Sequence, residues 1–183
     1  MRALLLCLAL VGSAVAADAA SIAVSPSASS LSIGDALDVA IVVDAGGLGV
    51  GGFDLDLLYD AAVLQLDAVT FGSGLDLGGF GSSRFSDGSL AGTLSAFEVS
   101  FEDPSDLLAA QPPSFALLTL RFVAVGAGTS ALSAAAGPSG TALSDAFGGV
   151  LATTFSGSSV SVPEPALAWL LAAAALLGFR RAR

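Results

Sequence analysis

Apolar and polar residues alternate along much of this chain, in short runs that are separated by turn residues. The clearest run covers residues 53–59, where every second side chain is apolar. Successive side chains of a β-strand point to opposite faces, so this run predicts a strand with one buried and one exposed face. The buried face is expected to carry Phe53, Leu55, Leu57 and Tyr59, and the exposed face Asp54, Asp56 and Leu58.

Similar runs elsewhere predict an all-β domain. Gly34 and Asp35 mark a turn, residues 44–52 are rich in glycine, and glycines between residues 72 and 81 indicate a long loop. The other expected strands cover residues 21–24, 37–43, 63–71, 90–99, 117–125, 130–135, 141–143, 150–155 and 158–162. Short strands with frequent turns favour a two-sheet sandwich or jelly roll of about nine strands, and residues 17–161 suffice for one such domain.

One connecting segment, residues 100–108, differs from the other loops because it is acidic and then apolar. Asp103 is suited to cap a helix, Pro104 to begin it, and Asp106 to act as a capping-box partner, so we expect one helical turn between two strands. Two interpretations remain open for this segment. It is either a locally capped connection or a binding edge formed by its apolar side chains, Phe101, Leu107 and Leu108.

The first 16 residues have the organisation of a secretory signal peptide. Met1 and Arg2 form a short positive region, residues 3–11 are apolar, and Ala14 and Ala16 provide small side chains for cleavage after Ala16. Cys7 is the only cysteine and lies within the apolar region. We therefore expect an exported mature chain that has neither disulfides nor thiol chemistry.

The C-terminal end predicts a membrane anchor. Residues 166–179 carry no charge and are followed by the basic residues Arg180, Arg181 and Arg183. As a helix this segment would be roughly 21 Å long, so it spans a hydrocarbon core of ~30 Å only marginally. The arginines are expected to stay in the cytoplasm and the preceding chain outside. The alternative is a buried C-terminal helix of a soluble domain.

Residues 162–183 resemble the PEP-CTERM sorting signal of Gram-negative bacteria. The resemblance rests on the box Val162, Pro163, Glu164 and Pro165, on the apolar segment and on the basic end, in that order. It implies processing near the box by an inner-membrane exosortase, and a link to exopolysaccharide and biofilm production. The expected final location is the cell surface or the extracellular matrix.

The charge of the expected domain limits its partners. Residues 17–161 contain 15 acidic residues and only two basic ones, Arg84 and Arg121, which gives a net charge of −13. Binding to nucleic acid requires basic side chains that neutralise phosphates, so nucleic acid is excluded as a partner. An anionic polysaccharide would also be repelled unless divalent cations bridged the two.

The order of the expected strands resembles the cohesin domain. The resemblance rests on residues 31–39, 52–60, 63–66, 118–122 and 126–130 and extends over roughly residues 22–160. It implies a nine-stranded β-sandwich of jelly-roll topology, similar to some carbohydrate-binding modules. Cohesins of cellulosomes bind dockerins, but the chain contains no dockerin-like repeat, so the resemblance does not identify a ligand.

The residue types of the expected domain argue against an enzyme. Residues 17–161 have no His, Cys or Lys, which removes most general bases and nucleophiles. Asp54 and Asp56 lie roughly 7 Å apart on one strand face, and such a pair is more typical of a solvated surface than of a glycosidase. The one candidate cofactor is calcium, with oxygen ligands from Asp54, Asp56 and Asp60, or from Glu102, Asp103 and Asp106.

Three hypotheses for function remain. The preferred one is protein–protein binding through a sheet face. The second is binding to carbohydrate such as exopolysaccharide, which is disfavoured because residues 17–161 contain no Trp and only one Tyr, Tyr59, at an expected core position. The third is a passive component of the matrix.

Overall fold

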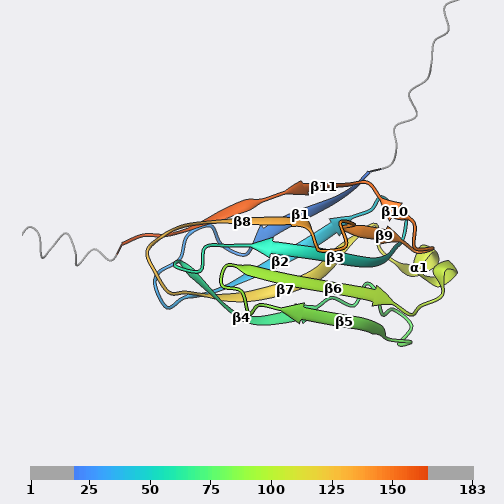
Figure 1. Ribbon diagram of the computed structural model, residues 1–183, viewed down its shortest axis with the longest axis horizontal. Helices are drawn as coiled ribbons and strands as arrows, with labels where there is room; N and C mark the ends of the chain where they lie inside the picture. The colour runs from blue at the N-terminus through green and yellow to red at the C-terminus, as the bar shows by residue number, and fades with distance from the viewer. Residues whose placement is uncertain (1–18, 165–183) are drawn as a thin grey trace, which may run out of the picture.

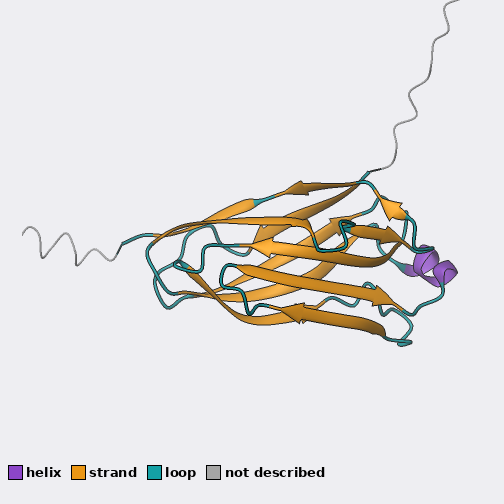
Figure 2. Cartoon of the chain, viewed as in Figure 1, coloured by secondary structure: helices purple, strands orange, loops and turns teal. Residues whose placement is uncertain are grey.

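The computed structural model describes residues 19–164, which fold into two β-sheets that pack face to face, with one short helix at one end (Figure 2). The elements are β1 (Ala20–Pro26), β2 (Ala36–Asp44), β3 (Val50–Leu58), β4 (Leu64–Phe71), β5 (Ser82–Asp87), β6 (Thr93–Ser100), α1 (Pro104–Ala110), β7 (Ser114–Ala124), β8 (Gly128–Ala136), β9 (Leu143–Asp145), β10 (Val150–Leu151), β11 (Thr153–Ser156) and β12 (Ser158–Val162). The predicted all-β, two-sheet sandwich is confirmed.

The first sheet has five strands in the order β11-β1-β2-β7-β4. The second has seven strands and is built around β3 (Figure 1). One edge of β3 pairs with β6, which in turn pairs with β5. The other edge pairs first with β9 and then with β8, and β8 also pairs with β12. All pairs are antiparallel except β1 with β11.

The hydrophobic core lies between the sheets and follows from the alternation of the sequence. In β3 the side chains of Phe53, Leu55 and Leu57 are buried, as the alternation predicts. Phe53 stacks on Phe71 of the opposite sheet with ring centroids 6.2 Å apart. Tyr59 is half-buried and packs edge-on against Phe122 at 4.9 Å, so its expected place beside the core is confirmed. Burial of these apolar side chains is the main stabilising contribution.

The predicted long loop contains a strand that the sequence did not suggest. We expected residues 72–81 to lead through a loop to a strand beginning at residue 90, whereas β5 occupies Ser82–Asp87 and β6 begins at Thr93. Strand β5 reads Ser-Ser-Arg-Phe-Ser-Asp and lies at an edge of its sheet. An edge strand needs few apolar side chains, so it leaves little periodic signal.

An ion-pair network lies between the sheets where β5 runs beside the loop that precedes it. Glu98 is 1% exposed and accepts hydrogen bonds from the Arg84 Nε, at 2.7 Å, and from the Ser82 hydroxyl, at 2.6 Å. The Arg84 guanidinium also lies 3.8 Å from the Asp76 carboxylate and 5.7 Å from the centre of the Phe71 ring. A buried carboxylate requires such partners, because burial without them is costly.

Helix α1 begins as predicted. Asp103 is its N-cap, Pro104 stands in its first turn, and the Asp103 side chain accepts from the Ser105 backbone N–H at 3.3 Å. Asp106 contributes its own backbone N–H to the Asp103 carbonyl at 2.9 Å, which is not the side-chain bond expected of a capping box. The helix is short, but its cap is well formed.

The two ends of the chain lie outside the described residues. The predicted signal peptide with Ala14 and Ala16, Pro165, the apolar segment 166–179 and the arginines Arg180, Arg181 and Arg183 therefore stay predictions. Within residues 19–164, no helix has the length and apolar character needed to cross a membrane. The described chain leaves the sandwich after β12, at the end opposite α1 (Figure 1).

Candidate functional site

The candidate site is the outer face of the seven-stranded sheet, where β5 and β6 present a strip of apolar side chains beside two carboxylates of β3. Phe85 of β5 is 50% exposed and stacks on Phe97 of β6, with ring centroids 5.7 Å apart. Val99 follows Phe97 on the same face of β6 and is 48% exposed. We call Phe85, Phe97 and Val99 the apolar strip. Exposed aromatic side chains on a flat sheet are typical of a protein contact surface.

Side-chain alternation explains why these residues face solvent. In β6 the side chains of Leu94, Ala96 and Glu98 point into the sandwich, so those between them point outward. Glu98 holds an inward position only because Arg84 and Ser82 bind its carboxylate. The ion-pair network thus allows Glu98 to follow the register, set by the buried Leu94 and Ala96, that keeps Phe97 and Val99 on the outer face.

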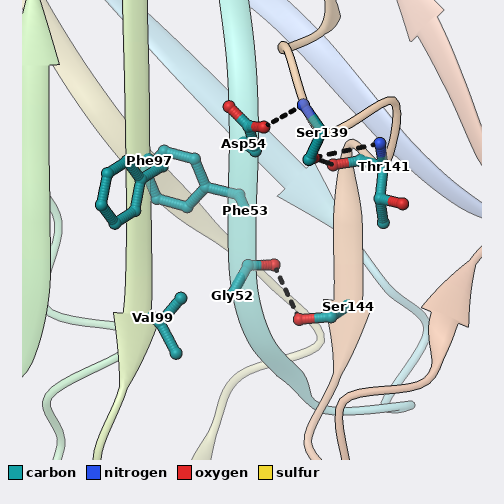
Figure 3. A pocket seen from close by; sticks show the side chains of 8 residues that line it. All are labelled: Gly52, Phe53, Asp54, Phe97, Val99, Ser139, Thr141 and Ser144. Atoms are coloured by element: carbon teal, nitrogen blue, oxygen red, sulfur yellow. Dashed lines mark hydrogen bonds between the residues drawn. The ribbon is translucent and has the colours of Figure 1, made fainter.

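A hollow of about 290 Å³ lies next to the apolar strip (Figure 3). Phe97 and Val99 form one wall, and Asp54 with residues of the 139–144 segment forms the other. Gly52 lies on the floor, where an added Cβ would come within 2.9 Å of the Glu98 carbonyl oxygen. The lack of a side chain at Gly52 thus keeps the hollow open. Its residues are Gly52, Phe53, Asp54, Phe97, Val99, Ser139, Thr141 and Ser144.

The polar groups of the face are held by hydrogen bonds. Asp54 accepts from the Ser139 backbone N–H at 2.9 Å, through Oδ2 (Figure 3). Asp56 accepts from the Ser95 hydroxyl at 2.6 Å, through Oδ1. Among the described residues each carboxylate is engaged through one oxygen, so the other oxygen can accept from a partner. The face can thus bind by apolar contact and by hydrogen bonds to carboxylates.

The structure does not bring the proposed calcium ligands together. Asp54 and Asp56 lie on the outer face, whereas Asp60 caps the following turn by accepting from the Ala62 N–H at 2.8 Å. The second proposed set, Glu102, Asp103 and Asp106, is divided as well. Glu102 is 7% exposed and accepts from the Gly78 N–H at 2.7 Å, whereas Asp103 caps α1. In residues 19–164 no three acidic side chains are grouped so that they could hold a metal ion.

The proposed binding edge of the α1 segment is only partly at the surface. Phe101 is 61% and Leu108 44% exposed, but Leu107 is 1% exposed. The prediction that Leu107 belongs to an exposed edge is therefore wrong, because the helix turns this side chain inward. Phe101 and Leu108 remain surface residues at the end of the sandwich.

The structure includes the first three residues of the predicted sorting box, which lie at the end of the folded domain. Val162 is the last residue of β12, pairs with Gly128 and is 1% exposed. Pro163 and Glu164 follow the strand and are exposed. The folded domain thus extends one residue into the predicted signal, and the Pro-Glu pair is accessible beyond it.

Sequence reasoning missed Phe85 and Phe97, the two central residues of the site. Phe97 lies in the predicted strand 90–99, where Leu94, Ala96, Phe97 and Val99 are apolar on both faces, so the alternation did not show which face is outward. The buried Glu98 adds to the ambiguity. One signal was available in the sequence. Phe97 lies three positions after Leu94, so in a strand its aromatic side chain faces the side opposite to Leu94. This signal alone is weak.

Comparisons with known proteins identify the fold. Neither protein-family models nor curated proteins match the sequence. Among solved structures, CaCohA2 of Clostridium acetobutylicum is similar with 21% identity, a TM-score of 0.60, and 80% of this chain and 92% of that chain covered. A type II cohesin domain from the cellulosome of Acetivibrio cellulolyticus is similar with 19% identity, a TM-score of 0.63, and 78% and 95% covered.

A third similar structure comes from an archaeon. The non-cellulosomal cohesin of Archaeoglobus fulgidus shares 15% identity, with a TM-score of 0.61 and with 80% of this chain and 92% of that chain covered. The described part of this chain therefore has a cohesin-like fold. At these identities the similarity concerns the fold alone, and it supports the expectation that was based on the strand pattern.

Proposed function

We propose that this protein is an exported, non-catalytic surface or matrix protein whose cohesin-like domain binds another protein through the outer face of its seven-stranded sheet. The observation that carries this proposal is the apolar strip of Phe85, Phe97 and Val99 beside a hollow of about 290 Å³. A sheet face that faces water and has no binding role would carry polar side chains at these positions.

Proteins of the same fold support this proposal. CaCohA2 has been solved in a complex with a variant of CaDoc0917. The sixth cohesin of scaffoldin B from Acetivibrio cellulolyticus has been solved in a complex with a Cel5 dockerin mutant. The fold is thus compatible with protein recognition, and the partner of this chain is to be sought by the chemistry of its own outer face.

That chemistry favours a partner with apolar and hydrogen-bond-donating side chains. The stacked rings of Phe85 and Phe97 offer apolar area that is already ordered, so binding costs little side-chain entropy. Asp54 and Asp56 add acceptors at the border of the strip. A partner surface with an apolar centre and Arg or Lys at its margin would complement both.

The test is capture of a partner from the secreted fraction of the same organism, with the tagged protein as bait. Phe97→Ser removes the central ring of the face, and Phe147→Ser is the matched control because Phe147 is a 75% exposed phenylalanine in the turn between β9 and β10. We expect a specific partner with the unmodified chain and with Phe147→Ser, and at least a tenfold weaker yield (about 1.4 kcal/mol) with Phe97→Ser. Equal capture by all three proteins contradicts the proposed face.

A glycan array distinguishes the carbohydrate hypothesis. The described residues contain no Trp, and their single Tyr is packed against Phe122, so the stacking platforms typical of sugar binding are lacking in this part of the chain. We expect a blank array with and without calcium. Specific glycan binding would support the second hypothesis, and a blank array together with an empty capture would favour a passive matrix role.

The proposal includes sorting by an exosortase at the C-terminal signal, with a transient stay in the inner membrane. Its support is the sequence of the box and the exposed position of Pro163 and Glu164 just beyond β12. Replacement Glu164→Ala is expected to leave an unprocessed, membrane-held form in cell fractions. Processing that is unchanged in this variant counts against an exosortase substrate.

A further inference from the structure

The free edge of β5 is the feature of the fold that the proposed function does not use. Strand β5 lies at the border of the seven-stranded sheet, and within the described residues it pairs only with β6 (Figure 1). Its residues from Ser83 to Asp87 are all exposed, so no part of the described chain covers this edge. An edge strand presents unpaired backbone donors and acceptors that can pair with another strand.

The β4 edge of the opposite sheet is interrupted by a bulge, whereas the β5 edge is not. Strand β4 carries a bulge between Leu66 and Ala68, and Asp67 at this bulge lies 3.6 Å from the Arg121 guanidinium. A bulge and exposed charges are devices that prevent edge pairing. Strand β5 pairs with β6 in unbroken register and has no proline, and its inward-pointing charge, Arg84, is neutralised by Glu98.

The hydrogen-bond pattern shows which backbone groups point to the free side. The Phe101 N–H donates to the Gly81 carbonyl at 3.1 Å, in line with the register in which Ser82 lies opposite Ser100. Hydrogen-bonded pairs alternate along an antiparallel ladder, so residues 83, 85 and 87 bond to β6. The N–H and C=O groups of Ser82, Arg84 and Ser86 therefore point away from the sheet.

These groups match a second copy of the same strand. In an antiparallel pair related by a two-fold axis at Phe85, each Arg84 lies opposite Ser86 of the other copy, and both residues use their free backbone groups. The two Phe85 side chains then meet on the outer face as a non-hydrogen-bonded pair, in which side chains are closest. Each Ser83 lies opposite Asp87 of the other copy. A register shifted by one hydrogen-bonding step would instead place Arg84 opposite Arg84 in one direction, or Ser86 opposite Ser86 in the other.

We infer that two copies of this protein pair through β5, in the register centred on Phe85, so that their seven-stranded sheets form one continuous sheet. In this dimer the apolar strips of the two copies meet at Phe85, and the two outer faces lie on the same side of the continuous sheet. The inference does not depend on the identity of any binding partner. It concerns only the edge of the strand and its self-complementarity.

The dimer is expected to be weak. A stable interface buries on the order of 1,200–2,000 Å², which is more than two six-residue strands can bury. The net charge of −13 on residues 17–161 of each copy also opposes association, and salt screens this repulsion. The dimer should therefore form at high protein concentration and become more abundant when salt is added.

Disulfide trapping tests the register directly. The full chain in detergent, with Cys7→Ser as background, is prepared in two forms that carry Ser83→Cys or Asp87→Cys. In the proposed register these two positions face each other across the dimer, whereas each lies roughly 14 Å from its own equivalent, too far for a disulfide. We expect the mixture to yield at least about tenfold more oxidised dimer than either form alone. An equal yield in all three samples, or no dimer in the mixture, overturns the inference.

A second pair of variants tests the backbone bonds. Ser86→Pro, added to both cysteine forms, removes an N–H that points to the free edge, whereas Ser86→Ala removes only the hydroxyl. We expect Ser86→Pro to abolish trapping and Ser86→Ala to retain it, and circular dichroism confirms that each variant is folded. Trapping that survives in folded Ser86→Pro overturns the inference. If this variant does not fold, the yields of oxidised dimer from the mixed and the separate cysteine forms decide whether the inference holds.

Discussion

Glu98 illustrates how a charged side chain is accommodated at an inward position of a strand. It occupies an inward position of β6 opposite the buried Phe53 and is 1% exposed. Its carboxylate is compensated by Arg84, whose side chain is 38% exposed, and by Ser82. Replacing such a pair by apolar side chains is often tolerated, whereas removing one partner leaves a buried charge alone.

A double-mutant cycle on this pair is the first prediction. Arg84→Met alone should lower the free energy of unfolding by about 2 kcal/mol, because Glu98 then remains buried without its cation. Glu98→Leu alone should cost a similar amount, about 1–2 kcal/mol, because the guanidinium loses its nearest carboxylate. The double variant should cost less than the sum of the two in urea denaturation. Strictly additive losses would show that the two side chains are not coupled.

Asp87, at the end of β5, provides a prediction on pH. Hydrogen bonds from the Ser89 backbone N–H, and then from the Ser89 hydroxyl, hold the pKa of Asp87 below its ordinary value of 3.8. A lowered pKa in the folded state stabilises the fold above the unfolded pKa, and this contribution is lost as the pH falls through the folded pKa. An NMR titration should show the low pKa, and Ser89→Ala should raise it part of the way. A normal pKa in the unmodified protein contradicts this assignment.

At the scale of elements, the sequence predicts strands well where one face is buried and poorly at the edges. The alternation in residues 53–59 predicts β3 and its buried face because Asp54 and Asp56 separate the core residues. Strand β5 was missed because its inward position is occupied by Arg84 rather than by an apolar residue. The cap of α1 was predictable from Asp103 and Pro104, since capping depends on local chemistry.

The position directly after β4 requires a glycine, because the backbone there lies close to β7. Gly72 donates its N–H to the Leu117 carbonyl at 2.8 Å, and an added Cβ would overlap the Ala116 carbonyl oxygen. Gly72→Ala should therefore lower the free energy of unfolding by about 2 kcal/mol or more. Gly88→Ala is the control, because the nearest atom to its Cβ would be the flexible end of Leu66, and it should cost less than about 1 kcal/mol. Equal melting temperatures for the two variants would contradict the close approach of β4 and β7.

At the scale of the whole molecule, the sequence predicted the sandwich but not the candidate site on its outer face. The candidate site depends on which strands are neighbours, because Phe85 and Phe97 are 12 positions apart in the chain and meet only through the pairing of β5 with β6. The hollow depends in turn on Gly52, Asp54 and Ser139, which the pairing of β3 with its neighbours and the loop after β8 bring together. Contacts of this kind are set by topology and leave no local signal in the sequence.

The stability of the β-sandwich domain should not respond to reductant. Cys7 is the only cysteine of the chain and lies in the predicted signal peptide, so residues 19–164 have no disulfide to lose. We expect the same melting temperature with and without dithiothreitol. A lower melting temperature in reductant would indicate that Cys7 is retained and forms an intermolecular disulfide.

The sandwich also determines where the C-terminal segment leaves the domain. The described chain leaves the sandwich at the end opposite α1, whereas the outer face extends along the side of the molecule (Figure 1). A membrane anchor at residues 166–179 would thus attach the domain by one end and leave the outer face accessible. With this geometry, the proposed processing at the sorting box would leave partner binding unchanged.

The most direct test of the proposed binding face is amide hydrogen exchange of the protein, alone and with the partner captured from the secreted fraction. The account predicts slower exchange in β5, in β6 around Phe97 and in the first half of β3, and no change in β2 and β7 of the opposite sheet. Protection confined to the five-stranded sheet, or to α1 and its neighbouring loops, would contradict it.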